Sequence, residues 1–96
     1  MKTAFLLMAQ YDGLAVIPVA WVCRDYFRHL TVEKFLRKVL DGEIDLPIVR
    51  IDRTSQKTAK AIHVNDLAAY LDKQTEAARK ECMQLKSSVT ALSGAA

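Results

Sequence analysis

Two short amphipathic segments, separated by only a few residues, limit the folds open to this chain more than any other feature. Apolar side chains in residues 19–27, and again in residues 32–40, recur at i, i+3, i+4, i+7 and i+8. That spacing lines one side of a helix with 3.6 residues per turn. Thr31 is a typical helix-capping residue, and Gly42 a typical helix end. The pattern predicts two helices joined by a tight turn at residues 28–30, as in a helix-turn-helix.

The second of these helices has a basic outer face. Glu33 and three cations fall outside its apolar stripe, and Lys34, Arg37 and Lys38 are spaced so that they share one face. A charged helix face is most often simply solvated. The same face also suits a recognition helix, because the major groove of DNA admits one helix and Arg or Lys can pair with guanine edges or phosphates. The helix pair alone leaves both interpretations open.

A basic hairpin is predicted directly after the helix pair. Residues 46–51 and 59–64 contain the β-branched and apolar residues of strands, and residues 52–58 between them contain no hydrophobic residue. Four cations between Arg50 and Lys60 accompany one anion, so this segment has a net charge of +3, equal to that of the whole 96-residue chain. It is either a solvated loop or a wing that follows the phosphate backbone. Helix, turn, helix and basic hairpin is the order of a winged helix-turn-helix domain.

Two more helices flank this unit. Residues 3–11 contain helix formers and almost no helix breakers, and an extended stretch follows at residues 15–18. After Asn65 or Asp66, an amphipathic pattern continues to about Leu85. We therefore expect an α+β fold, namely a winged helix-turn-helix with a short β-hairpin wing and a long C-terminal helix.

The expected DNA-binding domain covers residues 1–85. Residues 86–96 are expected to form a disordered tail, because they are small and polar. Residues 72–85 are a possible dimerisation extension, whose contact stripe would consist of Leu71, Ala78, Cys82 and Leu85. Gln74 and Ala78 make this stripe a poor coiled-coil heptad.

Length and motif content exclude several classes of function. A chain of 96 residues is one domain, too short for a multidomain enzyme or a (β/α)₈ barrel. Its two cysteines provide neither a disulfide framework nor zinc-ligand spacing, and no phosphate loop or catalytic motif is found. We therefore expect no enzyme activity, no cofactor and no metal.

A cytoplasmic location is expected. The apolar run at residues 4–9 is shorter than the roughly 7–15 residues of a signal-peptide core, and no A-x-A-like cleavage site follows it. No stretch approaches the roughly 20 apolar residues of a membrane helix, so we expect no membrane partner. Cys23 and Cys82 are expected to be reduced thiols.

The order of these motifs resembles the excisionase-like winged-helix layout. In that layout a short helix pair is followed by a Gly and a Leu-Pro, then by a basic wing, and then by a helix that opens with an acidic residue and L-x-x-(Y/F)-L. Here these features are VCRDYF at 22–27, Gly42 with Leu46-Pro47, the basic hairpin, and VNDLAAYL at 64–71.

Longer blocks resemble the pyocin activator protein (PrtN) family over nearly the whole chain. They are TAFLLMAQY at 3–11, VIP at 16–18, VCRDYF at 22–27, HLT at 29–31, LRKVL at 36–40, GEI at 42–44, LPIVR at 46–50 and SQK at 55–57. The resemblance implies a bacterial or prophage transcriptional activator. Such proteins bind short repeated DNA boxes upstream of bacteriocin (phage-tail-like) genes and switch these genes on after DNA damage. No expectation from the family is applied to the residues after about Leu85.

Residues 32–40 are therefore expected to be the reading helix, with double-stranded DNA as the partner. Lys34, Arg37 and Lys38 would contact bases or phosphates, while Thr31 and the helix N-terminus would lie near a phosphate. Arg28 would hold the DNA backbone just before this helix. The wing contact would be made by Arg53, Ser55, Gln56, Lys57 and Lys60.

Further partners expected are RNA polymerase and a second copy of the chain in a homodimer. Two alternatives remain. One is an excisionase-like architectural protein that uses the same surface to bend DNA. The other is an adapter that binds no DNA and docks a protein through its first or last helix.

Overall fold

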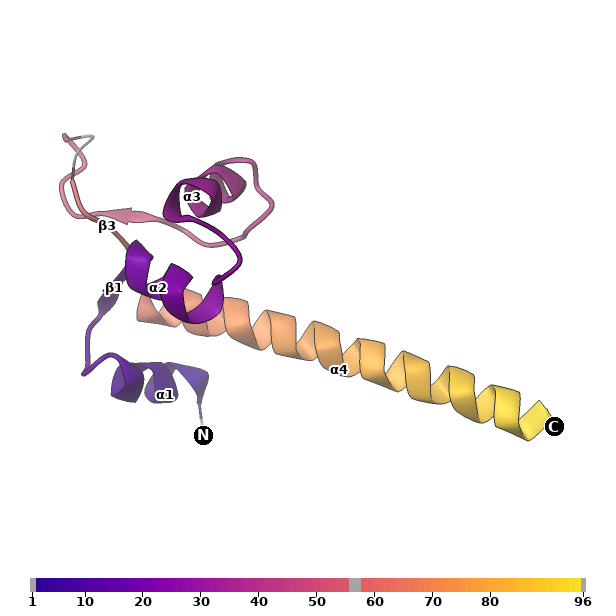
Figure 1. Cartoon of the computed structure of the whole chain (residues 1–96). Helices are drawn as coiled ribbons and strands as arrows, with labels where there is room; N and C mark the ends of the chain where they lie inside the picture. Colours follow the sequence, from indigo (N-terminus) through magenta and orange to yellow (C-terminus); the bar gives the residue numbers. More distant parts are fainter. Residues whose placement is uncertain (1, 56–57, 96) are drawn as a thin grey trace.

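The computed structural model (Figure 1) describes residues 2–55 and 58–95, with side chains as far as residue 88. In chain order its elements are α1 (Thr3–Gln10), β1 (Val16–Pro18), α2 (Val19–Tyr26), α3 (Val32–Leu40), β2 (Val49–Arg50), β3 (Lys60–His63) and α4 (Val64–Ala95). Within the described residues this is an α+β fold with four helices, the last of them long, and a three-stranded antiparallel sheet. The predicted fold class is confirmed, and the layout is that of a winged helix.

The helix pair α2–α3 forms as the apolar spacing predicts. Phe35 is fully buried, and its ring centroid lies 4.8 Å from that of Phe27 at the end of α2. Thr31 caps α3, because its Oγ1 accepts a hydrogen bond from the Lys34 backbone N at 3.2 Å. The bounds of α3 agree with the prediction, whereas α2 ends at Tyr26, one residue early. Gly42 has a φ of +77°, the left-handed conformation that terminates helices.

The sheet has the strand order β1-β3-β2, with antiparallel pairing throughout. The predicted hairpin is the β2–β3 pair, in which Val49 faces Ala61 and Arg50 faces Lys60. The pairing of β1 with β3 was not predicted. It places Ile17 opposite Ile62, and both side chains are fully buried. This pair contributes the sheet's side of the hydrophobic core, against which the helices pack.

The hairpin strands are shorter than predicted. β2 contains only two residues, because Leu46 is buried in the core and Pro47 has no N–H to donate to a ladder. β3 ends at His63 rather than at Val64. Val64 instead begins α4, and its N–H donates to the Ala15 carbonyl at 2.8 Å. The longer strands expected over residues 46–51 and 59–64 were therefore wrong at their ends.

The first helix packs along the first turns of α4, on the side of the body away from α3 (Figure 1). Leu7 and Tyr11 are buried in the core. Thr3 Oγ1 donates to Asp72 Oδ1 at 2.5 Å, and Tyr26 Oη donates to Gln10 Oε1 at 2.7 Å. These bonds join α1 to α4 and to α2. A helix with no charged side chain is thereby held on the domain.

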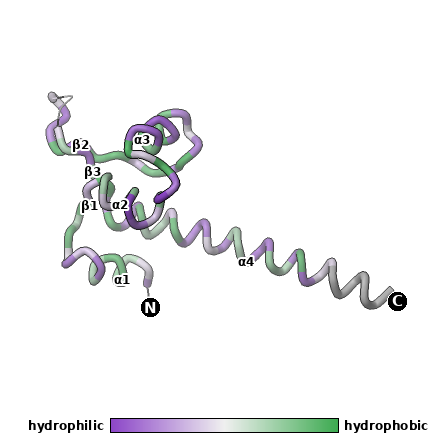
Figure 2. Tube along the Cα trace, in the orientation of Figure 1, coloured by the Kyte–Doolittle hydropathy of each residue, from purple (hydrophilic) through white to green (hydrophobic). Residues whose placement is uncertain are grey.

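The last helix leaves the body of the domain and projects from it (Figure 1). Residues 72–88 are all exposed, and the longest dimension of the molecule is 64 Å. Hydrophilic and hydrophobic residues alternate along the projecting part (Figure 2). The predicted helix end near Leu85 was wrong, because α4 continues through residues 86–95. That stretch contains no proline, and its alanines favour helix.

Among the residues that the structure describes, no helix combines the length and the apolar character needed to cross a membrane.

Candidate nucleic-acid interface

The outward face of α3 carries Lys34 and Arg37, both exposed. In the described part of the chain neither forms an ion pair. Lys38 differs from them: its side chain is 42% exposed, and its Nζ lies 3.5 Å from Glu43 Oε2. A surface pair of this kind is weak. The predicted basic face therefore consists of two free cations with a third, partly neutralised one at its flank.

The N-terminal end of α3 brings together two other predicted residues. Thr31 uses its Oγ1 for the helix cap, so its hydroxyl proton remains available as a donor. Arg28 is exposed in the turn before α3 and lines a shallow recess of about 360 Å³ that also contains Thr31 and Arg24. The positive end of the helix dipole points into this region. Cation, hydroxyl and helix N-terminus together suit an anion such as a phosphate.

The hairpin loop presents Arg53 through a local network around Asp52. Asp52 Oδ1 accepts from the Thr54 backbone N at 3.0 Å and from Thr54 Oγ1 at 2.6 Å. These bonds lower the pKa of Asp52. Its backbone N donates to Thr58 Oγ1 at 2.9 Å. The one anion of the hairpin therefore shapes the loop from which the exposed Arg53 projects.

The remaining predicted wing residues are placed only in part. Ser55 and Lys60 are half-buried, whereas Gln56 and Lys57 lie outside the described residues. Lys60 stands in β3 and faces the α3 side of the hairpin, where it lines a groove shared with Leu36 and Leu40 of α3. The structure thus brings Lys60 next to α3 and leaves Arg53 farther out on the loop.

Arg50 is a candidate that sequence reasoning missed as a site residue. It pairs with Lys60 in the hairpin register and lines the groove beside α3. It also lines a second recess, of about 330 Å³, together with Arg53. Arg50 therefore connects the two cationic parts of the hairpin. The charge count of the segment included it, but only the register shows which side chain it faces.

The residues predicted for dimerisation all lie on α4, but they differ in burial. Leu71 is half-buried against the core of the domain. Ala78, Cys82 and Leu85 are exposed on the projecting part, and Leu85 is 63% exposed. Ala78, Cys82 and Leu85 therefore lie on the same side of α4 as the core-facing Leu71, but on the part of the helix that is exposed to solvent. Leu71 belongs to the core end of that face.

Among the described residues, the side chains that could bind a metal or act as nucleophiles do not form a cluster. Burial raises the pKa of the Cys23 thiol, and Cys82 is exposed. Within the residues that the structure describes, no group of three or more His, Cys, Asp or Glu side chains is placed to hold a metal ion.

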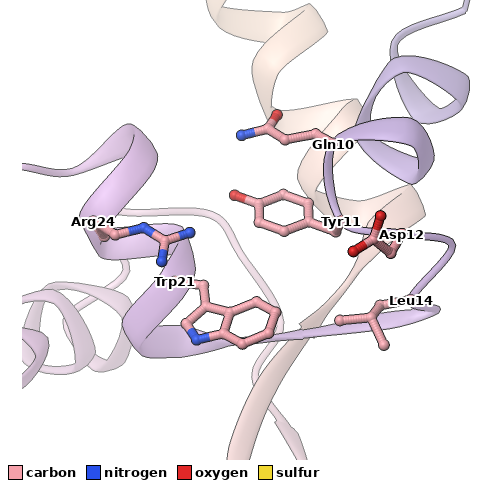
Figure 3. A pocket seen from close by; sticks show the side chains of 6 residues that line it. All are labelled: Gln10, Tyr11, Asp12, Leu14, Trp21 and Arg24. Carbon is pink, nitrogen blue, oxygen red and sulfur yellow. The ribbon is translucent and has the colours of Figure 1, made fainter.

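An aromatic cleft of about 320 Å³ lies between α1 and α2 (Figure 3). Its rings are Tyr11 and Trp21, stacked with centroids 6.3 Å apart, and the Arg24 guanidinium lies 5.8 Å from the Trp21 centroid. Arg24 Nε also donates to Asp25 Oδ1 at 2.9 Å, and Tyr11 Oη donates to Asp25 Oδ2 at 2.6 Å. The Arg24 and Tyr11 hydrogen bonds lower the pKa of Asp25 to about 2. Burial, followed by the bond to Asp25, raises the pKa of Tyr11.

The lowered pKa of Asp25 predicts an acid-sensitive link between α1 and α2. An unfolded aspartate titrates near about 3.9, so its stabilising contribution is complete above that pH and is lost as the pH falls toward 2. We expect Asp25→Asn to lower the free energy of unfolding by about 1 kcal/mol at pH 7 and by less at pH 2. Urea unfolding of both proteins from pH 2 to pH 7 measures the difference. A difference independent of pH would contradict the assignment.

The family comparison covers the elements just described. The family model described as pyocin activator protein PrtN matches residues 3–78, from the start of α1 into the projecting part of α4. The match includes the helix pair and the hairpin, and it confirms the resemblance found in the sequence. No curated protein and no solved structure matches the chain significantly. By the extent of its match to the family model, the chain belongs to the pyocin activator protein PrtN family.

Proposed function

We propose that this chain is a sequence-specific DNA-binding transcriptional activator of pyocin genes. The observation that carries the proposal is the free basic face of α3 (Lys34 and Arg37) beside a hairpin that adds Arg50, Arg53 and Lys60. An α-helix with its side chains is about 10–12 Å in diameter, so α3 fits a major groove about 12 Å wide. The family match supports activation of pyocin genes as the role.

The distribution of charge supports the same placement. Residues 24–63 contain nine cations and six anions, a net charge of +3, whereas residues 1–23 and residues 64–96 are each neutral overall. All of the net positive charge therefore lies on the segment with the helix pair and the hairpin. A local basic surface of this kind attracts the phosphate backbone and steers association with DNA.

In this proposal α3 reads bases with Arg37 and Lys34, and Lys38 contacts the backbone at the flank. Arg28 and Thr31 bind a phosphate at the start of α3. The wing contact comprises Arg53, Ser55, Gln56, Lys57 and Lys60. The sites are repeated promoter boxes upstream of bacteriocin genes, occupied after DNA damage. The bound chain acts in the cytoplasm, on the nucleoid, and contacts RNA polymerase.

A homodimer is part of the same proposal, because repeated boxes suit paired readers. The contact is the exposed part of the stripe on α4, with Ala78, Cys82 and Leu85. An isolated projecting helix is marginally stable in water, so a second copy would stabilise it. We expect Leu85→Glu to shift sedimentation from dimer to monomer at micromolar concentration. Lys80→Glu, on the opposite side of the same exposed helix, is the matched control and leaves the dimer intact. A monomeric wild-type protein would contradict the contact.

Reporter activation tests the function as a whole. A promoter that carries the bound box is placed before a reporter gene, and the chain is supplied from a separate plasmid. We expect induction that depends on both the box and Arg37. Binding without induction would favour the architectural alternative. Absence of binding to any duplex at low salt would favour a protein-binding adapter, because even non-specific basic domains bind DNA there.

A further inference from the structure

A groove of about 370 Å³ runs between α3 and the hairpin, and its lining is of two kinds. One wall is apolar and the other is cationic. The lining residues are Leu36, Val39, Leu40, Ile48, Arg50 and Lys60, and we call this feature the α3–hairpin groove. None of these side chains is acidic, and Leu40 is 86% exposed at its edge. The groove therefore offers positive charge beside an apolar surface.

The two cations are held on the same side of the hairpin. Arg50 and Lys60 are direct partners in the antiparallel register of β2 and β3. Directly opposed residues have Cβ atoms only about 5 Å apart, and like charges in such a pair destabilise a sheet. Side chains alternate along a strand, so Lys60 shares its face with the buried Ile62. Both cations therefore point toward the α3 side, where core residues would otherwise continue.

Nothing within the described protein offsets this repulsion. In residues 2–55 and 58–88, neither Arg50 nor Lys60 forms an ion pair with a carboxylate. The backbone carbonyls at the end of α3 do not need Arg50 or Lys60 as hydrogen-bond donors either. The carbonyls of Arg37, Lys38 and Val39 already accept hydrogen bonds from the backbone N–H groups of residues 41–44. Two like charges aimed into a groove without a protein partner are an arrangement that favours an external anion.

We propose that the α3–hairpin groove binds one strand of the DNA backbone, with phosphates held by Arg50 and Lys60. This site rests on the proposed DNA-binding function and adds Arg50 to it. Deoxyribose rings pack against the apolar wall formed by Leu36, Leu40 and Ile48. The strand passes from the groove toward Arg53, because Arg50 also lines the recess that contains Arg53. The groove thereby fixes the angle at which α3 enters the major groove.

Salt dependence of binding tests the site. Each neutralised phosphate contributes about 0.9 to the slope of log K against log salt. We expect the double variant Arg50→Gln, Lys60→Gln to lower the magnitude of this slope by about 2 on a fluorescent duplex. At 0.15 M salt this corresponds to binding roughly 30-fold weaker than that of the wild type. Arg50→Lys, which keeps the charge, retains the wild-type slope.

The matched control removes two cations from α4. Lys73→Gln, Arg79→Gln has the same loss of charge, and both residues are exposed on the projecting helix. We expect its slope to equal that of the wild type. An equal decrease in slope for both double variants would overturn the groove, because it would show an effect of net charge alone. Thermal unfolding of each variant identifies any loss of folded protein.

Neutral methylphosphonate linkages locate the contact. Single linkages are placed in turn along a duplex that contains the DNA box that the chain binds, as recovered by selection from genomic DNA. In the wild type, affinity falls at every contacted phosphate, including one or two adjacent linkages on the strand that lies in the α3–hairpin groove. In the Arg50→Gln, Lys60→Gln variant, those groove linkages have no further effect, whereas the other linkages still do, as expected of groups that interact directly. Additive losses at every linkage, with DNA binding otherwise intact, would overturn the groove but not the proposed function. A wild-type chain that binds no duplex would contradict both.

Discussion

Phe35→Ala is expected to lower the free energy of unfolding by about 3–5 kcal/mol. The ring is fully buried in α3 and packs against Phe27, whose centroid is 4.8 Å away. Its removal leaves a cavity between the two helices of the helix-turn-helix, and the lost transfer energy adds to the cost of that cavity. A chain of 96 residues has a total stability of about 5–14 kcal/mol. The variant should therefore melt at least about 10 °C below the wild type.

Leu40→Ala is the matched control for this prediction. Leu40 ends the same helix but is 86% exposed, so its truncation should change the free energy of unfolding by less than about 0.5 kcal/mol. Circular dichroism at 222 nm during heating compares the two variants directly. Equal melting temperatures for Phe35→Ala and Leu40→Ala would mean that α3 does not dock through Phe35.

Arg37→Ala is expected to weaken binding to the selected box by about 1–3 kcal/mol, or roughly 5- to 150-fold. Arg37 lies at the centre of the exposed face of α3 and has no ion pair within the described residues. Its guanidinium can donate two parallel hydrogen bonds to the O6 and N7 atoms of a guanine. Because the side chain is exposed and Ala favours helix, the melting temperature should stay unchanged. The loss therefore concerns recognition and not folding.

Fluorescence anisotropy with the box and with single-base variants of the box measures this effect. A base contact predicts that the loss for Arg37→Ala is confined to one base pair of the site. Arg79→Ala, which removes an exposed arginine from α4, is the control and should bind the box as the wild type does. Equal weakening on all sequences would make Arg37 a phosphate contact. Unchanged affinity would mean that α3 is not the reading helix.

The helix pair could be predicted closely because its signals are local. In α3 the apolar spacing, the cap at Thr31 and the Gly42 helix end all agree, and the observed bounds are those predicted. In α2 the spacing extends to Phe27, but the helix ends at Tyr26 and Phe27 turns into the core. The cap and the helix end depend on residues no more than four positions apart, whereas the place of Phe27 depends on its contacts with Phe35 and Tyr70.

The sheet and the last helix were harder to predict because their determinants are not local. Pairing of Ile17 with Ile62 joins residues 45 positions apart, and no short pattern indicates it. The length of α4 was underestimated because residues 86–95 are small and polar, a composition compatible with helix or with coil. In the same way, Pro47 indicates where a strand cannot pair, but not that β2 has only two residues.

The candidate site was predicted from charge and could be refined only by geometry. The cations of α3 were found from their spacing, yet the pairing of Lys38 with Glu43 depends on the turn after α3. Arg50 was counted in the basic segment but not assigned to the site, because the residue it faces depends on the β2–β3 register. Gln56 and Lys57 lie outside the described residues, so their wing contacts stay predictions.

Selection of bound fragments from a bacterial genomic DNA pool tests the central claim most directly. The wild-type chain is incubated with the fragments at about 0.15 M salt, and the bound DNA is sequenced. DNA reading by α3 and the hairpin predicts enrichment of a short repeated box, located upstream of bacteriocin genes. The Arg37→Ala protein, in parallel, should not enrich that box. Recovery of fragments with no shared sequence, or of no DNA even when the salt is lowered to 0.05 M, would contradict the account.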